Sequence, residues 1–164
     1  MTGQSGQYPA HAIPDEWNQL TGRIIGAAME VHSILGPGML EKMYEDALCV
    51  ELERADIPFQ RQQSIRMNYK GAPIGDLRLD VVVADLVVVE LKAIERVLEV
   101  HGAQLHSYMR STALPLGLLI NFNVIKLTDG ITRRLNPHCP RFQSLPLLSS
   151  ADSVSSVFLP GGSR

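Results

Sequence analysis

The chain has 164 residues, 45% of them hydrophobic and 20% charged, with a net charge of −2 and a pI of about 6.2. This composition is typical of one soluble globular domain and excludes a globally basic nucleic-acid-binding protein, so any contact with nucleic acid must come from a local patch. The first residues lack the apolar core of a signal peptide, and no apolar run is long enough to span a bilayer. With two cysteines expected to remain unpaired, we predict a cytoplasmic protein without a membrane partner.

Hydrophobic spacing and turn residues predict two helices, three strands, a third helix and a buried strand, in that order. The expected helices cover residues 14–35, about 39–55 and about 96–111. The expected strands cover residues 59–70, 74–83, 87–93 and 117–122, with one short strand within 123–134. Three antiparallel strands followed by a crossover helix and another strand predict an α/β fold, a mixed sheet of four to five strands flanked by helices.

The ends of the chain differ from this middle part. Residues 1–13 are polar and small, and the pattern after residue 135 becomes rich in Pro and Ser. We therefore expect a disordered N-terminal tail over 1–13, one domain over 14–135 and a loose C-terminal tail over 136–164.

The stretch from Asp80 to Lys92 reads DVVVADLVVVELK and is predicted to be a buried hairpin. Burying a charge is costly unless it is paired or binds a metal, so Asp80, Glu90 and Lys92 mark a candidate functional site. Glu90 and Lys92 are two apart and share a face of the strand. A carboxylate that binds Mg²⁺ beside an ammonium group suits phosphodiester hydrolysis, and Mg²⁺ needs only one or two protein carboxylates. On the pattern alone, a cross-strand salt bridge is an equally good interpretation.

The turn decides whether Asp80 can reach Glu90. A two-residue loop at Ala84-Asp85 would pair Asp80 with Val89 and turn Glu90 to the other face. A three-residue loop, or a bulge, would pair Asp80 directly with Glu90. The metal-site hypothesis therefore predicts either a three-residue loop or a bulge.

At this point the sequence resembles a known group. Asp80 with Glu90-Leu91-Lys92 is similar to the D…ExK core of the PD-(D/E)xK nuclease superfamily, and Gly38 to Tyr44 (GMLEKMY) is similar to the motif of the GxxExxY protein family, a branch of it. The resemblance covers about residues 16–134 and departs in having Leu79, not Pro, before Asp80. It implies the restriction-endonuclease-like core.

The resemblance also implies roles for particular residues. Asp80 and Glu90 would be metal ligands, with Glu41 as an additional ligand to metal or water. Lys92 would be the catalytic lysine, and the Leu91 carbonyl would be a backbone ligand. The implied ion is Mg²⁺ (or Mn²⁺), and the implied partner is DNA or RNA.

Gln104 and Tyr108 form a QxxxY pattern similar to one that follows the ExK strand in RecB-like nucleases. Being four apart on the predicted third helix, they share a face. Gln104 could orient Lys92 or contact substrate, and Tyr108 could bind a phosphate. The alternative is that both only tie the helix to the sheet. Tyr44 is expected to pack under the first strands and His32 to be structural.

These residues lead to a Mg²⁺-dependent phosphodiesterase acting on DNA or RNA as the first hypothesis. A non-catalytic binding or accessory module that keeps the nuclease fold is the alternative, and an enzyme acting on a small phosphorylated substrate is a third.

Four cations on the first two strands could hold a phosphate backbone or simply form a solvated edge: Arg61, Arg66, Lys70 and Arg78. An edge strand at 59–70 could pair with a second copy in a homodimer.

Overall fold

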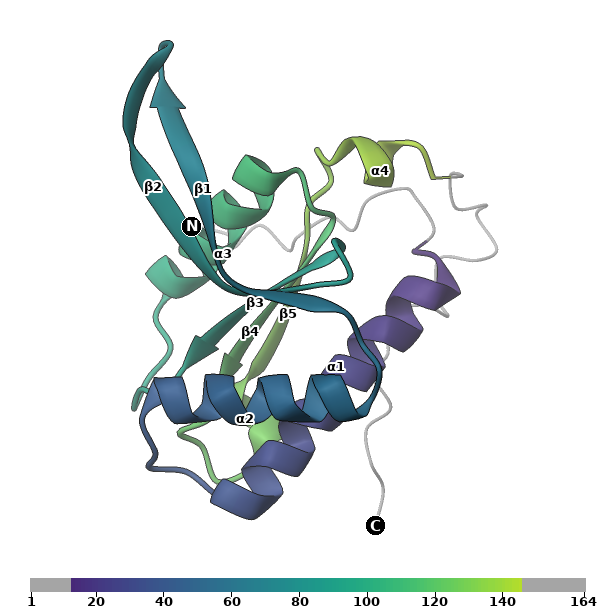
Figure 1. The fold of residues 1–164 in the computed structure, drawn as a ribbon, viewed down its shortest axis with the longest axis vertical. Helices are drawn as coiled ribbons and strands as arrows, with labels where there is room; N and C mark the ends of the chain where they lie inside the picture. Colours follow the sequence, from purple (N-terminus) through teal and green to yellow (C-terminus); the bar gives the residue numbers. More distant parts are fainter. Residues whose placement is uncertain (1–12, 146–164) are drawn as a thin grey trace, which may run out of the picture.

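The computed structural model describes residues 13–145, which form one mixed sheet covered by helices on both faces (Figure 1). The sheet has five strands in the order β1-β2-β3-β4-β5. Within residues 13–145, three helices of three or more turns surround it, and the predicted α/β class is confirmed. The elements are α1 (Asp15–Leu35), α2 (Glu41–Arg54), β1 (Phe59–Tyr69), β2 (Ala72–Val83), β3 (Val87–Lys92), α3 (Glu99–Thr112), β4 (Leu116–Asn121), η1 (Leu127–Gly130), β5 (Ile131–Leu135) and α4 (Pro140–Gln143).

Neighbouring strands are antiparallel except at the centre of the sheet. β3 and β4 are parallel and are joined through α3, the crossover that a parallel pair requires. β1 and β5 are the edges, so the predicted edge position of the first strand is confirmed. The distal half of the β1–β2 hairpin projects beyond the rest of the molecule (Figure 1). The homodimer through this edge stays a prediction.

The two faces of the sheet carry separate hydrophobic cores because side chains alternate along each strand. Val81, Val83, Val87 and Val89 belong to the core that α1 and α2 cover. Val82 and Val88, between them, belong to the core that α3 covers. The Val-rich runs are therefore buried on both sides, which explains why their sequence lacks a polar face.

Tyr44 ties the loop between α1 and α2 to the sheet. Its ring is completely buried and stacks on Phe122, just after β4, with 4.4 Å between centroids. Its hydroxyl donates to the Gly36 carbonyl at 2.5 Å and accepts from the Met39 amide at 3.1 Å. Tyr44 is thus structural, as predicted, although its partner follows the fourth strand rather than the first ones. His32 is structural too, with Nε2 2.8 Å from the Val124 carbonyl.

Replacing Tyr44 by Phe is expected to lower the free energy of unfolding by about 1–3 kcal/mol, because two backbone groups lose their partner. Urea denaturation measures the loss. Tyr69→Phe is the matched control, since Tyr69 is 62% exposed. Equal midpoints for the two variants would contradict the role assigned to the Tyr44 hydroxyl.

The fold continues past the predicted boundary at residue 135. Cys139 and Phe142 are completely buried in the core under α1. Cys139 directly precedes α4, and Phe142 is the buried residue of that helix. The Pro-rich pattern led to the prediction of a loose tail, but Pro140 is at the first turn of α4, where proline is favourable. Residues 1–12 and 146–164, which include most of both predicted tails, lie outside the described part.

Two further expectations can be compared with the described residues. Cys49 and Cys139 are both free, as predicted, and both are buried. Between residues 13 and 145, no helix combines the length and the apolar character needed to cross a membrane. The third helix begins at Glu99 instead of about Arg96, because the side chain of His101 accepts a hydrogen bond from the Leu98 amide and caps the helix there.

Candidate active site

The hairpin between β2 and β3 has the three-residue loop that the metal-site hypothesis predicted. Val83 pairs with Val87, which leaves residues 84–86 in the loop, and the register continues to the pair of Val81 and Val89. One more residue in the same register sets Asp80 against Glu90. Ala84 and Asp85 both have left-handed backbone conformations, with φ of 51° and 49°. The prediction of a three-residue loop, made from the sequence, is therefore confirmed.

Asp80 lies where β2 separates from β3. The β2–β3 pairing ends at Val81, and the Asp80 carboxylate accepts a hydrogen bond of 2.9 Å from the Leu91 amide. On the other side of β2, the pair that Asp80 would make with Gln62 is missing, and Gln62 has a left-handed φ of 50°. The strand is thus irregular on both sides at Asp80, and the carboxylate replaces a backbone acceptor for β3.

Glu90 and Lys92 point the same way from β3 and form a close ion pair. Lys92 Nζ lies 2.7 Å from Glu90 Oε1, and their side chains are only 14% and 4% exposed. The other oxygen, Glu90 Oε2, is buried and has no hydrogen-bond partner within the described structure. A buried carboxylate oxygen without a partner is costly, so this atom has unused capacity to bind a donor or a cation.

The pKa values reflect three carboxylates crowded near one ammonium group. The pKa of Glu90 is raised to about 7, mainly by burial and then by the charge of Asp80, while the hydrogen bond and charge of Lys92 act in the opposite direction. Burial also raises the pKa of Asp80, against the hydrogen bond from Leu91. Burial lowers the pKa of Lys92, but the hydrogen bond and charge of Glu90, with Glu41 and Asp80, outweigh it, so the net shift is upward.

Glu41 reaches this cluster from the first residue of α2. Burial raises its pKa, Lys92 lowers it and Asp80 raises it, which places all three groups within electrostatic range. The backbone of Ala93, one residue beyond β3, also forms a hydrogen bond with Glu41. The structure therefore brings Glu41 to the end of β3 that carries Lys92, as the resemblance implied.

One turn further along α2, Glu45 fixes the helix to the first strand. Its Oε1 lies 2.9 Å from Arg61 Nη2, and its Oε2 accepts from Gln62 at 2.7 Å. Arg61 also contacts Asp46. Two of the four cations are therefore ion-paired: Arg61 with these carboxylates, and Arg66 with Asp76 at 3.7 Å. For these two arginines, the alternative of a solvated edge is the better interpretation.

Gln104 and Tyr108 lie on α3 and bind one another. Gln104 Nε2 donates to the Tyr108 hydroxyl at 2.7 Å. Tyr108 is 9% exposed and belongs to the core between α3 and the sheet. Lys92 takes its hydrogen bond to Glu90 instead of to Gln104. The shared helix face was correctly predicted, whereas the contact between Gln104 and Lys92 is not formed in this structure.

Asn121 is a site residue that sequence reasoning did not identify. It pairs with Lys92 in the parallel β3–β4 register and is 2% exposed. Its side chain accepts from the Ile94 amide at 3.1 Å and donates to the Ile94 carbonyl at 2.9 Å. It thereby fixes the chain just after Lys92. The available signal was an Asn at the end of an otherwise apolar run, GLLIN.

The residues present fit a hard divalent cation. Asp80, Glu90 and Glu41 supply only oxygen donors, which Mg²⁺ and Mn²⁺ prefer, and Glu90 Oε2 is an orphaned buried oxygen. Within residues 13–145, no three His, Cys, Asp or Glu side chains are already gathered in a ligating arrangement. In this structure the Asp80 carboxylate accepts a hydrogen bond from the Leu91 amide, and the Glu90 carboxylate accepts one from Lys92.

Comparison with known proteins gives one match. The family model described as the PD-(D/E)XK nuclease superfamily matches residues 18–134. These residues include Glu41, Asp80, Glu90 and Lys92 and run from α1 into β5. No curated protein and no solved structure matches the chain.

Proposed function

Because the chain belongs to the PD-(D/E)XK nuclease superfamily, we propose that it is a divalent-metal-dependent nuclease that hydrolyses phosphodiester bonds in DNA or RNA. The observation that supports this most strongly is the convergence of Asp80, Glu90 and Lys92 where β2 separates from β3. Glu90 is 3% exposed, and one of its oxygens has no described partner. A purely structural salt bridge would not account for that unsatisfied oxygen.

In this proposal, Asp80, Glu90 and Glu41 hold the ion, for which Mg²⁺ or Mn²⁺ is the proposed identity. When bound, such an ion polarises a phosphoryl oxygen and lowers the pKa of a bound water. The Leu91 amide fixes the Asp80 carboxylate by its 2.9 Å hydrogen bond, so this ligand is oriented in advance. Asn121 fixes the backbone that follows Lys92.

Lys92 is proposed as a catalytic cation rather than a base. Burial lowers its pKa, but the neighbouring carboxylates outweigh burial and leave the pKa above the usual value of 10.5. At pH 7 the Lys92 amine is therefore protonated, so it carries a positive charge and cannot act as a base. Placed beside the carboxylates, the ammonium can align the attacking water and stabilise negative charge on the transferring phosphoryl group.

Metal removal tests the proposal. Purified protein is expected to cleave a mixture of labelled single- and double-stranded DNA and RNA with Mg²⁺ or Mn²⁺, to stop when EDTA is added, and to recover when the metal is restored. Gel electrophoresis of the products measures this. Cleavage that persists in EDTA would contradict the metal requirement. No cleavage of any of the four substrates with either metal would favour the non-catalytic module.

The narrower membership in the GxxExxY family is also part of the proposal. Its motif places Glu41 at the start of α2 and Tyr44 one turn later. Because Tyr44 anchors the preceding loop to the sheet through Gly36 and Phe122, the motif positions the helix end that carries Glu41. This physical link between the motif and the metal ligands supports the narrower assignment.

A further inference from the structure

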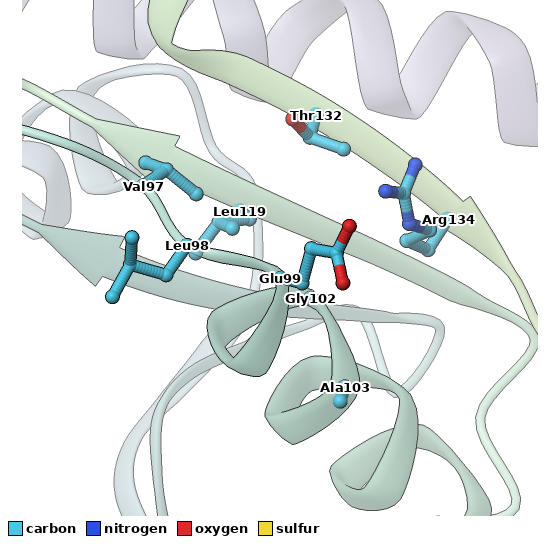
Figure 2. Close-up of a pocket in the computed structure, with 8 residues that line it drawn as sticks. All are labelled: Val97, Leu98, Glu99, Gly102, Ala103, Leu119, Thr132 and Arg134. Carbon is cyan, nitrogen blue, oxygen red and sulfur yellow. The ribbon is translucent and has the colours of Figure 1, made fainter.

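A pocket of about 380 Å³ lies beside the active site, between the start of α3 and strands β4 and β5 (Figure 2). Leu119 forms its floor, Thr132 and Arg134 line it from β5, and Gly102 lines it from α3. Figure 2 shows Val97 on the side opposite the two β5 residues. The volume is in the range of roughly 300–1,000 Å³ typical of small-molecule sites, and too small for a base pair with its backbone.

The sheet register places this pocket one strand away from the catalytic carboxylate. Glu90 pairs with Leu119, and Leu119 pairs with Thr132. Paired residues in a sheet project to the same face, and adjacent strands are about 4.8 Å apart. The pocket floor is thus the neighbour of Glu90 across the sheet. This separation is comparable to the distance from a cleaved phosphate to the adjoining nucleoside.

The chemistry of the lining fits a nucleoside with its phosphate. Val97 and Leu119 offer an apolar surface for a base, and the Glu99 carboxylate can accept hydrogen bonds from a base amino group. Arg134 is exposed, and its guanidinium can hold a phosphate. Gly102 contributes no side chain, which leaves the space open on the α3 side.

From this arrangement, and resting on the proposed nuclease function, we propose that the pocket binds one unpaired nucleotide next to the cleaved phosphodiester. Arg134 holds a phosphate and the apolar floor contacts the base. The protein then prefers single-stranded or locally unpaired nucleic acid, because a paired base cannot enter a pocket of this size.

Filling the pocket tests the proposal without relying on catalysis. In Gly102→Leu, a Cβ would meet Arg134 Nη2 at 3.8 Å, an ordinary contact, and the rest of the side chain would enter the pocket. Fluorescence anisotropy with a labelled hexanucleotide, without divalent metal, is expected to show about tenfold weaker binding of the single strand than wild type. Binding of the corresponding duplex is expected to change little.

Gly22→Leu is the matched control, because Gly22 is an exposed helical glycine of α1 with nothing within 4 Å of an added Cβ. Equal affinities of Gly102→Leu and Gly22→Leu for the single strand would overturn the proposal. Equal losses for single strand and duplex in Gly102→Leu would overturn it as well, since the pocket would then not select an unpaired base.

A second variant avoids any change in the helix. Arg134→Gln is expected to reduce the slope of log affinity against log salt for the single strand by about 0.7, the value for one phosphate contact. Arg110→Gln, an exposed cation outside the pocket lining, serves as the control. An unchanged slope in Arg134→Gln would contradict the phosphate role. These binding results stand apart from cleavage, whose absence in the wild type would contradict the proposed function instead.

Discussion

Replacing Glu90 by Gln is expected to lower the rate of nucleic-acid cleavage at least about 10²- to 10³-fold and, at the same time, to stabilise the metal-free protein at pH 8. The loss of activity follows from the removal of a metal-binding carboxylate. The gain in stability follows from burial, since an uncharged amide of the same shape has no buried charge to desolvate. Cleavage assays and urea denaturation measure the two effects on the same protein preparation.

The sign of the stability effect follows from linkage. The pKa of Glu90 is about 7 in the folded state, against 4.5 as the ordinary value. Between these pH values the folded protein keeps a proton that the unfolded chain releases, so the free energy of unfolding falls as pH rises through this window. At about 1.4 kcal/mol per pKa unit, and with the lost partner of Lys92 opposing the gain, the variant is expected to be about 1–3 kcal/mol more stable above pH 7.

Below pH 4.5, where Glu90 is protonated in both states, this difference is expected to disappear. Glu53→Gln is the matched control, because Glu53 is an exposed carboxylate of α2. It is expected to leave both cleavage and the pH dependence unchanged. A Glu90→Gln variant that is less stable than wild type at pH 8 would show that the ion pair with Lys92 outweighs burial.

Replacing Lys92 by Met is expected to reduce cleavage by about 10²- to 10³-fold, while the variant still binds metal at alkaline pH. The ammonium is proposed to act on the phosphoryl group, and the carboxylates that would hold the ion remain. Without Lys92, which lowers the pKa of Glu90, that pKa is expected to rise further. Metal binding should then require a higher pH, which a titration with Mn²⁺ at several pH values measures.

Lys126→Met is the control for this variant, because Lys126 is an exposed lysine outside the candidate site. A Lys92→Met protein that cleaves at the wild-type rate would contradict the catalytic role. A protein that loses metal binding at every pH would instead show that Lys92 only shapes the carboxylate cluster.

The sequence was sufficient to predict the β2–β3 hairpin and the length of its loop because charge and hydrophobicity conflict there. Asp80, Glu90 and Lys92 interrupt a run of Val and Leu, and the faces of a strand follow strictly from a period of two. The count of residues between Asp80 and Glu90 could therefore be converted into a required loop length. The structure has that loop, with Val83 paired to Val87.

Features that depend on backbone irregularity were not predictable in this way. Gln62 has an ordinary strand sequence around it, yet its left-handed φ of 50° accompanies the break in pairing beside Asp80. The contact between Asp80 and the Leu91 amide forms on the other side of β2, where the pairing with β3 ends. Propensity describes regular strands and carries no signal for a single residue at which a strand bends.

Contacts between elements distant in sequence were also missed. Asn121 holds the backbone at Ile94, 27 residues earlier, and the pocket joins Gly102 of α3 to Arg134 of β5. Gln104 was predicted to face the site, but its position next to Tyr108 one turn later gave it a nearer partner. Such choices between partners depend on side-chain geometry, which helical spacing alone does not determine.

The central claim, that Asp80 and Glu90 hold a divalent ion beside Lys92, is tested most directly by Mn²⁺ binding measured with electron paramagnetic resonance. The wild-type protein is expected to bind Mn²⁺ at pH 8, and Asp80→Asn and Glu90→Gln are each expected to weaken that binding by at least about tenfold, with Glu53→Gln unchanged. If both site variants bind Mn²⁺ as tightly as wild type, the carboxylates at this strand separation do not hold the ion.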